Sequence, residues 1–167
     1  MSRSNKIDFM GQLGEEIIDT VYTETGHVVK MSTNPYDEEK DCWIDEVKTE
    51  IKTQTPLFQE NAFTIPVTNN YCQLYRNQLP KAIYAEQLLF VQNPVRGNDR
   101  VIKIWKAPEV QHRNIWRFHL NRHDKRLTTL WPIEKLELVF QFENDHWFSK
   151  FKEYDVSKYT NYGRHAA

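Results

Sequence analysis

Two acids and a lysine in the segment of residues 41–54, DCWIDEVKTEIKTQ, have a spacing that could build a cation-dependent site. Side chains alternate between the two faces of a strand, so Glu50 and Lys52 share one face. With a two-residue turn at positions 45–46, the chain folds back as a hairpin and Asp41 comes opposite Glu50. Two carboxylates beside an ammonium group can bind a hard divalent cation and stabilise anionic oxygens.

Asp37 and Asp45 are rival acids in the same region. In the hairpin, Asp45 shares the face of Asp41 but lies about four residues, or ~13 Å, further along the ribbon. We interpret Asp45 as a turn residue, because Asp tolerates the backbone conformations of tight turns. The turn lacks the Gly that a two-residue hairpin favours, and the pairing of Asp41 with Glu50 is therefore a working assumption.

Three short motifs follow one another in the first half of the chain. GQLGEE at residues 11–16 resembles a GxxGE motif in a first helix, Asp41 resembles an acid at a hairpin entry, and EIK at residues 50–52 resembles an ExK signature. Together they resemble the PD-(D/E)xK nuclease superfamily, which includes many restriction enzymes, junction resolvases and phage nucleases. The resemblance covers about the first half of the chain. Lys40 stands where a Pro commonly precedes the acid, and the interval from Asp41 to Glu50 is short.

The resemblance implies roles for the residues of the hairpin. Asp41, Glu50 and the backbone carbonyl of Ile51 would bind Mg²⁺ or Mn²⁺, and such an oxygen-rich ligand set suits Mg²⁺. Lys52 would orient or deprotonate the attacking water and support the phosphate in the transition state. The alternative interpretation of Lys52 is an exposed strand lysine without a catalytic role.

Glu15 is the fourth catalytic candidate, and it could contact the metal through a water. Glu15 and Glu16 flank the apolar stripe of the first helix on opposite sides, so either could reach a site at the edge of the sheet. The resemblance favours Glu15 because Gly14 precedes it. The alternative for both residues is an ordinary solvated acid on a helix.

Hydrophobic periodicity and turn residues divide the first two thirds of the chain into helices and strands. An apolar stripe predicts a helix over residues 8–24, with Gly26 as its stop, and Pro56 ends the second strand of the hairpin. We predict the remaining segments as a strand over 27–31, a loop over 32–40, a helix over 69–85 that Pro80 breaks or begins, and strands over 87–92 and 100–105. This order indicates an α/β fold with a central mixed β-sheet flanked by helices, and the resemblance implies a restriction-endonuclease-like core.

The pattern is weaker beyond residue 105. We predict a short helix over 109–118, then strands, or a strand and a helix, over 126–131 and 135–142. Tyr71, Leu74 and Tyr84 are predicted core residues. The 167 residues are expected to form one domain, with a core over about 8–105, a basic C-terminal extension over about 106–155 and a loose tail after 155.

Charge is distributed unevenly along the chain. Residues 1–60 contain 13 Asp or Glu against 6 Lys or Arg, whereas residues 61–167 contain 10 acids against 16 bases. Residues 100–126 alone carry 8 bases and 2 acids. An acidic half can hold a cation and a basic half can hold a polyanion, although a solvated surface of uneven charge is the alternative.

The candidates for nucleic-acid contact lie at the end of the hairpin, in the following helix and in the basic stretch. From Trp116 to His123 the sequence interleaves aromatic and basic side chains, as a surface that follows phosphates would. The candidates are Gln54, Arg76, Gln78, Lys81, Arg117, Arg122 and Lys125.

Several other classes of protein find no support in the sequence. His119 and His123 have the spacing of a helical zinc pair, but HLNRH lacks the glutamate of the metalloprotease motif, and neither Cys42 nor Cys72 lies in a CxxC motif. The chain has no nucleophile-elbow serine, no Walker loop and no dinucleotide fingerprint, so we expect no nucleotide cofactor. No apolar run is long enough to cross a bilayer, and two cysteines favour a reducing cytoplasm, that of the host for a phage-encoded protein.

The sequence therefore predicts a metal-dependent endonuclease that hydrolyses DNA, resembling small phage enzymes, and one active site per chain suggests a homodimer. A nucleic-acid-binding or assembly protein that kept the nuclease fold and lost activity is the alternative. Duplex, branched or single-stranded DNA, or RNA, all stay open as substrates.

Overall fold

The computed structural model of the chain describes residues 3–32, 42–69, 71, 73–75, 78–97, 99–108 and 114–165, with only the backbone described for 3–8 and 156–165. The elements in chain order are α1 (Arg3–Glu24), β1 (Val29–Met31), β2 (Cys42–Ile44), β3 (Val47–Gln54), β4 (Ala62–Pro66), α2 (Gln78–Tyr84), β5 (Gln87–Gln92), β6 (Ile102–Ala107), β7 (Arg117–Leu120), β8 (Leu127–Pro132), a 3₁₀ turn (Ile133–Lys135), β9 (Glu137–Phe142) and α3 (Asp145–His165).

The described strands form two sheets. The larger sheet has the order β1-β2-β3-β5-β6-β9, and the smaller has the order β4-β8-β7. In the larger sheet β3 and β5 run parallel, while the other neighbouring strands are antiparallel. The chain is thus an α/β protein with a central mixed β-sheet, as the sequence predicted.

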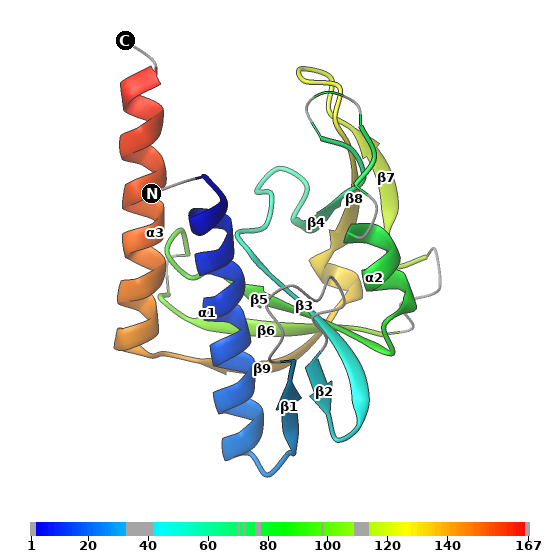
Figure 1. Cartoon of the computed structure of the whole chain (residues 1–167), viewed down its shortest axis with the longest axis vertical. Coiled ribbons are helices and arrows are strands. Elements are labelled where there is room, and N and C mark those ends of the chain that lie inside the picture. Colours follow the sequence, from blue (N-terminus) through cyan, green and yellow to red (C-terminus); the bar gives the residue numbers. More distant parts are fainter. Residues whose placement is uncertain are drawn as a thin grey trace.

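Each face of the central sheet packs against a different layer. Ile51, Leu89 and Val91 belong to a hydrophobic cluster with residues of α1 and α3, such as Ile17 and Phe151. The alternate residues, Leu88 and Phe90 among them, face a second cluster that includes β4 and β8. Figure 1 shows α1 and α3 on one side and α2 with the smaller sheet on the other. The two faces of β3 therefore point toward different partners.

The hairpin of β2 and β3 has the predicted register. Ile44 pairs with Val47, and Trp43 pairs with Lys48. The turn residues Asp45 and Glu46 have φ values of 51° and 67°. Two positive φ values are typical of a type I′ turn, whose twist matches that of the flanking strands.

Replacing Glu46 with glycine should stabilise the protein. A residue with a Cβ is strained in the left-handed region by roughly 1–2 kcal/mol, and glycine removes this strain. Part of the gain is lost, because glycine has more conformational freedom in the unfolded chain. We expect a net gain of about 0.5–1 kcal/mol, or a rise in melting temperature of roughly 1–4 °C. Thermal unfolding measures the shift, and Glu46→Ala, which keeps the Cβ, is the matched control. Equal melting temperatures for the two variants would contradict the strain argument.

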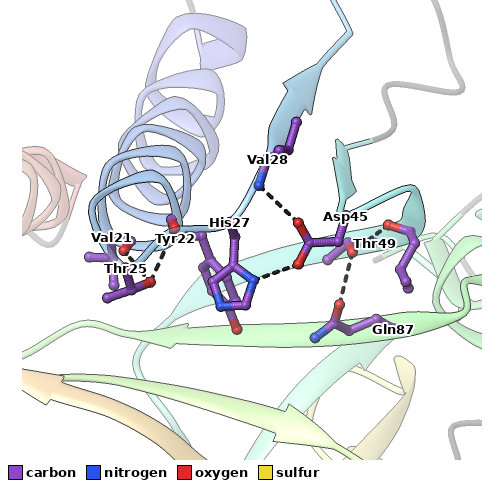
Figure 2. Close-up of polar contacts among 9 residues, drawn as sticks. Val21, Tyr22, Thr25, His27, Val28, Asp45, Thr49 and Gln87 are labelled. Atoms are coloured by element: carbon purple, nitrogen blue, oxygen red, sulfur yellow. Dashed lines mark hydrogen bonds and ion pairs between the residues drawn. The ribbon is translucent and has the colours of Figure 1, made fainter.

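Helix α1 ends at the predicted glycine. Gly26 has a φ of 92°, its N–H donates to the Thr23 carbonyl, and the His27 N–H donates to the Tyr22 carbonyl. The Thr25 hydroxyl donates to the carbonyls of Val21 and Tyr22, as Figure 2 shows. These bonds satisfy carbonyls that the end of a helix leaves open, in a Schellman arrangement that needs a residue tolerant of positive φ.

The smaller sheet contains an element that the sequence did not predict. β4 pairs with β8, and β8 pairs with β7, so the sheet joins residues about 65 positions apart in the chain. The chain after β4 stays beside β8, because the N–H groups of Val67 and Thr68 both donate to the Leu127 carbonyl. Thr68 and Leu74 then form an isolated bridge. We call residues 62–75 and 117–132, so far as they are described, the arm.

Three predictions of secondary structure were wrong. The helix expected over 69–85 begins only at Gln78, because Asn69 accepts hydrogen bonds from the N–H groups of Tyr71 and Gln73 and starts a turn instead. Pro80 lies in the first turn of α2, where a missing N–H costs little. Residues 117 and 118, expected in a helix, belong to strand β7. The tail expected to be loose after residue 155 continues α3 to His165.

The expected core and extension also differ from the structure. Tyr71, Leu74 and Tyr84 are exposed rather than buried, because the first two lie in the turn and the third ends a short helix. Residues 106–155 are not an appended extension, since β9 pairs with β6 and β8 pairs with β4. Residues 135–142, left undecided, form β9 after the 3₁₀ turn. No helix in the described part of the chain is long and apolar enough to cross a membrane.

Candidate active site

Glu50 and Lys52 lie side by side on β3, as their spacing predicted. Lys52 Nζ is 3.3 Å from Glu50 Oε1, and the two side chains are only 18% and 12% exposed. Lys52 Nζ also donates a hydrogen bond of 2.7 Å to Gln78 Oε1 in the first turn of α2. The lysine is therefore held between a carboxylate and an amide, which is not the arrangement of a freely solvated strand lysine.

This pair lies on the face of the sheet opposite α1. Thr53, on the other face, packs so closely on α1 that a Cβ added to Gly14 would lie 1.7 Å from Thr53 Oγ1. Glu50 pairs with Leu88 and Lys52 with Phe90, both members of the cluster shared with the smaller sheet. Ile51, whose backbone carbonyl was a predicted metal ligand, pairs with Leu89 and packs against the first cluster.

The second predicted carboxylate lies outside the described residues. The last described pair of the hairpin is Cys42 with Thr49. Asp41 precedes Cys42 in the sequence, and its predicted pairing with Glu50 stays a prediction. Asp37 also lies outside the described part of the chain. Among the residues that are described, no three His, Cys, Asp or Glu side chains gather as a metal would require.

Glu15 lies near the hairpin but on the other side of the sheet. Burial, together with the nearby carboxylates of Asp19 and Glu15, raises the pKa of the Cys42 thiol to about 12. Cys42 belongs to the cluster that packs against α1, which places Glu15 on this side. The described residues therefore do not bring Glu15 together with Glu50 and Lys52. Glu16 is exposed on α1.

An open cavity of about 590 Å³ lies at the carboxyl ends of the parallel strands β3 and β5. Lys52, Gln54 and Gln78 line it, together with residues of α1, β4 and α3. The carboxyl end of parallel strands is a common place for a ligand site. The cavity gives Lys52 access to a molecule from outside, whereas Glu50 is not among its lining residues.

The far wall of this cavity holds polar residues that the sequence did not single out. Asn93 Nδ2 is 3.5 Å from Asp155 Oδ1, and Arg96 Nε is 3.8 Å from Asp155 Oδ2. Asn93 follows β5 directly, and this position after a buried strand could have marked it. Asp155 comes from α3, 62 residues later, and no local pattern connects it to the site.

Gln54 is engaged in holding the two sheets together. Its Oε1 accepts a 2.7 Å hydrogen bond from the Thr64 N–H, and its Nε2 donates at 2.8 Å to the Thr64 carbonyl. The side-chain amide of Gln54 thus bonds both backbone groups of Thr64, as the backbone of a neighbouring strand would. We therefore assign Gln54 a structural role in this conformation, beside its predicted contact with nucleic acid.

Asp45 lies in the hairpin turn, away from Lys52, as the turn interpretation expected. Its carboxylate accepts a 2.9 Å hydrogen bond from the Val28 N–H and lies 2.6 Å from His27 Nδ1, as Figure 2 shows. The bond from His27, followed by that from Val28, holds the pKa of Asp45 below its usual range. These contacts connect the turn to the start of β1.

The basic candidates occupy different environments. Arg117 pairs with Glu60 at 3.1 Å, whereas Arg122 and Lys125 are exposed in the turn between β7 and β8. Lys81 is half-buried in α2, and Arg76 lies outside the described residues. His119 lies on β7, so the helical spacing that suggested zinc does not apply to it.

Acids compensate part of the charge of the basic stretch. Arg100 pairs with Asp145, Lys103 with Asp99, and Arg126 with Asp124. These three ion pairs neutralise part of the charge that the described residues of 100–126 carry.

Comparisons with family models, with curated proteins and with solved structures found no match to this chain.

Proposed function

We propose that this protein is a metal-dependent endonuclease that hydrolyses DNA phosphodiester bonds. The contact between Glu50 and Lys52, on the second strand of the hairpin and with Lys52 at the cavity, carries the proposal. The pair combines a carboxylate for a hard cation with an ammonium group for a phosphate oxygen.

The order of the elements supports a restriction-endonuclease-like core. Helix α1 leads into the antiparallel strands β1, β2 and β3, and after α2 the chain returns as β5, parallel to β3. The GQLGEE segment lies on α1 and the EIK segment lies on β3, an arrangement that supports the resemblance to PD-(D/E)xK nucleases. Gly14, the second glycine of GQLGEE, lies where α1 meets β3, beside the strand that carries the ExK residues.

The described residues fit part of a Mg²⁺ or Mn²⁺ site. Glu50 provides a hard oxygen donor that is largely withdrawn from solvent, and the backbone carbonyl of Ile51 is the neighbouring oxygen. Asp41 would provide the second carboxylate. A bound divalent cation supplies Lewis acidity, which lowers the pKa of a bound water and neutralises charge on the phosphate.

Lys52 has the position of a group that acts on the phosphate. Its three N–H donors exceed the two described contacts, with Glu50 and Gln78, so it has a donor to offer a phosphate oxygen. The Glu50 carboxylate lies 3.3 Å from the ammonium group, and the Gln78 amide accepts a hydrogen bond from it, so the two side chains orient the lysine. Gln78, a predicted nucleic-acid contact, is thus also a positioning residue for Lys52.

Plasmid nicking tests the proposal directly. The purified protein should relax supercoiled plasmid DNA with Mg²⁺ or Mn²⁺ and should not do so with a chelator. The same cations should raise the melting temperature of the wild type, because they bind only the folded site, and Asp41→Ala should abolish this rise. Binding of DNA without any cleavage would favour the inactive nucleic-acid-binding protein instead.

A further inference from the structure

The arm exposes a group of large apolar side chains that the folded chain leaves in contact with solvent. Tyr71 is 84% exposed and Leu74 is 73% exposed, and Tyr75, Phe118 and Leu120 are exposed as well. Isolated exposed apolar residues are common, but several on one small substructure indicate a binding surface.

These side chains lie on neighbouring chain segments. Leu120 pairs with Leu127 on one side of β8, while Thr68 bonds to Leu127 on the other side. Neighbouring strands are about 4.8 Å apart, so Leu120 and Thr68 lie roughly 10 Å from each other. Thr68 forms the bridge to Leu74, which brings the turn containing Tyr71 beside the β7–β8 hairpin, as Figure 1 shows at the top right.

The Phe118 ring packs against buried aromatic residues. Its ring lies edge-on to Trp116, with ring centroids 5.2 Å apart, and Trp116 stacks on the fully buried Trp131 at 5.8 Å. The half-exposed Phe118 ring is therefore placed by a buried aromatic column. A ring held in this way can offer a flat face to a ligand at little entropic cost.

The charge of the arm selects the kind of ligand. Its residues, 62–75 and 117–132, contain four Lys or Arg and one Asp, a net charge of +3, and Glu60, just before the arm, pairs with Arg117. That Asp, Asp124, already pairs with Arg126 at 2.6 Å. Arg122 and Lys125 are exposed in the β7–β8 turn. A second copy of this chain, docked arm to arm, would bring together two positive surfaces, whereas a polyanion would be attracted.

We propose that the arm binds unpaired bases of a nucleic-acid strand. Tyr71 and Tyr75 would stack with the bases, Phe118 would extend this platform, and Arg122 and Lys125 would contact phosphates, as proteins that bind single strands do. In duplex DNA the bases already stack on each other, so their faces are not open to these rings. The inference deepens the proposed nuclease function, on which it rests for the ligand class, and points to a substrate that is single-stranded or has an unpaired segment.

The arm is also connected to the candidate active site. Gln54 bonds β3 to β4 through Thr64, and Gln78, shortly after Tyr75 in the chain, bonds Lys52. A strand bound along the arm could therefore continue into the cavity that Lys52 lines.

Fluorescence anisotropy in the presence of a chelator tests this inference without any cleavage. The probes are a fluorescein-labelled oligothymidine and the same strand annealed to its complement. Wild type should bind the single strand more tightly than the duplex. Tyr71→Ala should weaken single-strand binding by roughly five- to a hundredfold, the range expected for losing one stacked base, and should leave duplex binding nearly unchanged.

Tyr84→Ala is the matched control, because Tyr84 is 77% exposed but lies at the end of α2, outside the arm. It should bind both probes as wild type does. Replacing both Arg122 and Lys125 with Gln should reduce the slope of log affinity against log salt by about 1.4 on the single strand.

Three results would overturn the inference: equal affinities of Tyr71→Ala and Tyr84→Ala for the single strand, tighter binding of the duplex by wild type, or no binding of either probe. The Tyr71 side chain is 84% exposed, so loss of folding is not expected, and thermal unfolding of each variant verifies this. A protein that binds through the arm yet never nicks DNA would refute the nuclease proposal and keep this one.

Discussion

Replacing Lys52 with methionine should reduce plasmid nicking by a factor of roughly 10²–10⁴, the range seen when one general acid–base or transition-state donor is lost. Methionine keeps a flexible apolar stem of similar length, so packing against Phe90 and its neighbours should change little. Nζ contacts Glu50 and Gln78, and its removal leaves no ammonium group to meet the phosphate. Glu50→Gln should cause a comparable loss, because an amide is a poorer ligand for Mg²⁺.

Lys48→Met is the matched control for Lys52→Met. Lys48 lies on the same strand and, four residues earlier, on the same face, about 13 Å from Lys52 along β3. We expect its nicking rate to equal that of the wild type. Thermal unfolding must show both variants folded, since removal of one partner from a half-buried ion pair destabilises to some degree. Full nicking activity in Lys52→Met would exclude the mechanism proposed for this site.

Replacing Gly14 with alanine should destabilise the protein by about 1–3 kcal/mol, although alanine is the better helix former. The new Cβ would lie 1.7 Å from Thr53 Oγ1 and 2.9 Å from Thr53 Cβ. Thr53 is short and lies within a central strand, so rotation alone cannot remove the clash and α1 must move away from β3. For a chain of this length the loss corresponds to a fall in melting temperature of roughly 2–12 °C.

Gly11→Ala is the control in the same helix. Apart from its neighbours in α1, no described atom lies within 4 Å of a Cβ added to Gly11, so the substitution should stabilise α1 by roughly 0.5–1 kcal/mol. In a Thr53→Ala background Gly14→Ala should cost less, because the nearest atom is gone. Thr53→Ala alone should be well tolerated, as Thr53 Oγ1 is buried with no hydrogen-bond partner among the described residues. A Gly14→Ala protein as stable as Gly11→Ala would refute the close approach of α1 and β3.

The two predictions test different properties of the motifs. Lys52→Met tests the chemistry of the candidate site, and Gly14→Ala tests the packing of α1 on β3. Gly14 belongs to the GQLGEE segment, and its role in the structure is steric, because it lets α1 approach Thr53. Lys52 lies one residue earlier on the opposite face, toward α2 and the smaller sheet. Measuring stability and nicking on both variants therefore shows whether the resemblance reflects a common fold, a common reaction or both.

The sequence by itself determined the features that depend on neighbouring residues. The hairpin register follows from a turn at Asp45 and Glu46 and from the alternation of the flanking strands. The end of α1 follows from Gly26, because glycine adopts a positive φ without strain. The contact of Glu50 with Lys52 follows from the two-residue period of a strand, since residues i and i+2 share a face in any tertiary context.

Only the tertiary structure decided which segments meet. A period of two or 3.6 residues marks an apolar face but does not name its partner, and the smaller sheet joins strands separated by loops and helices. For this reason β4 was missed, and Tyr71 and Leu74 were assigned to the core. The same long-range packing brings Gln78 to Lys52 and leaves the rings of the arm exposed, because burial is a property of the whole fold and not of the local sequence.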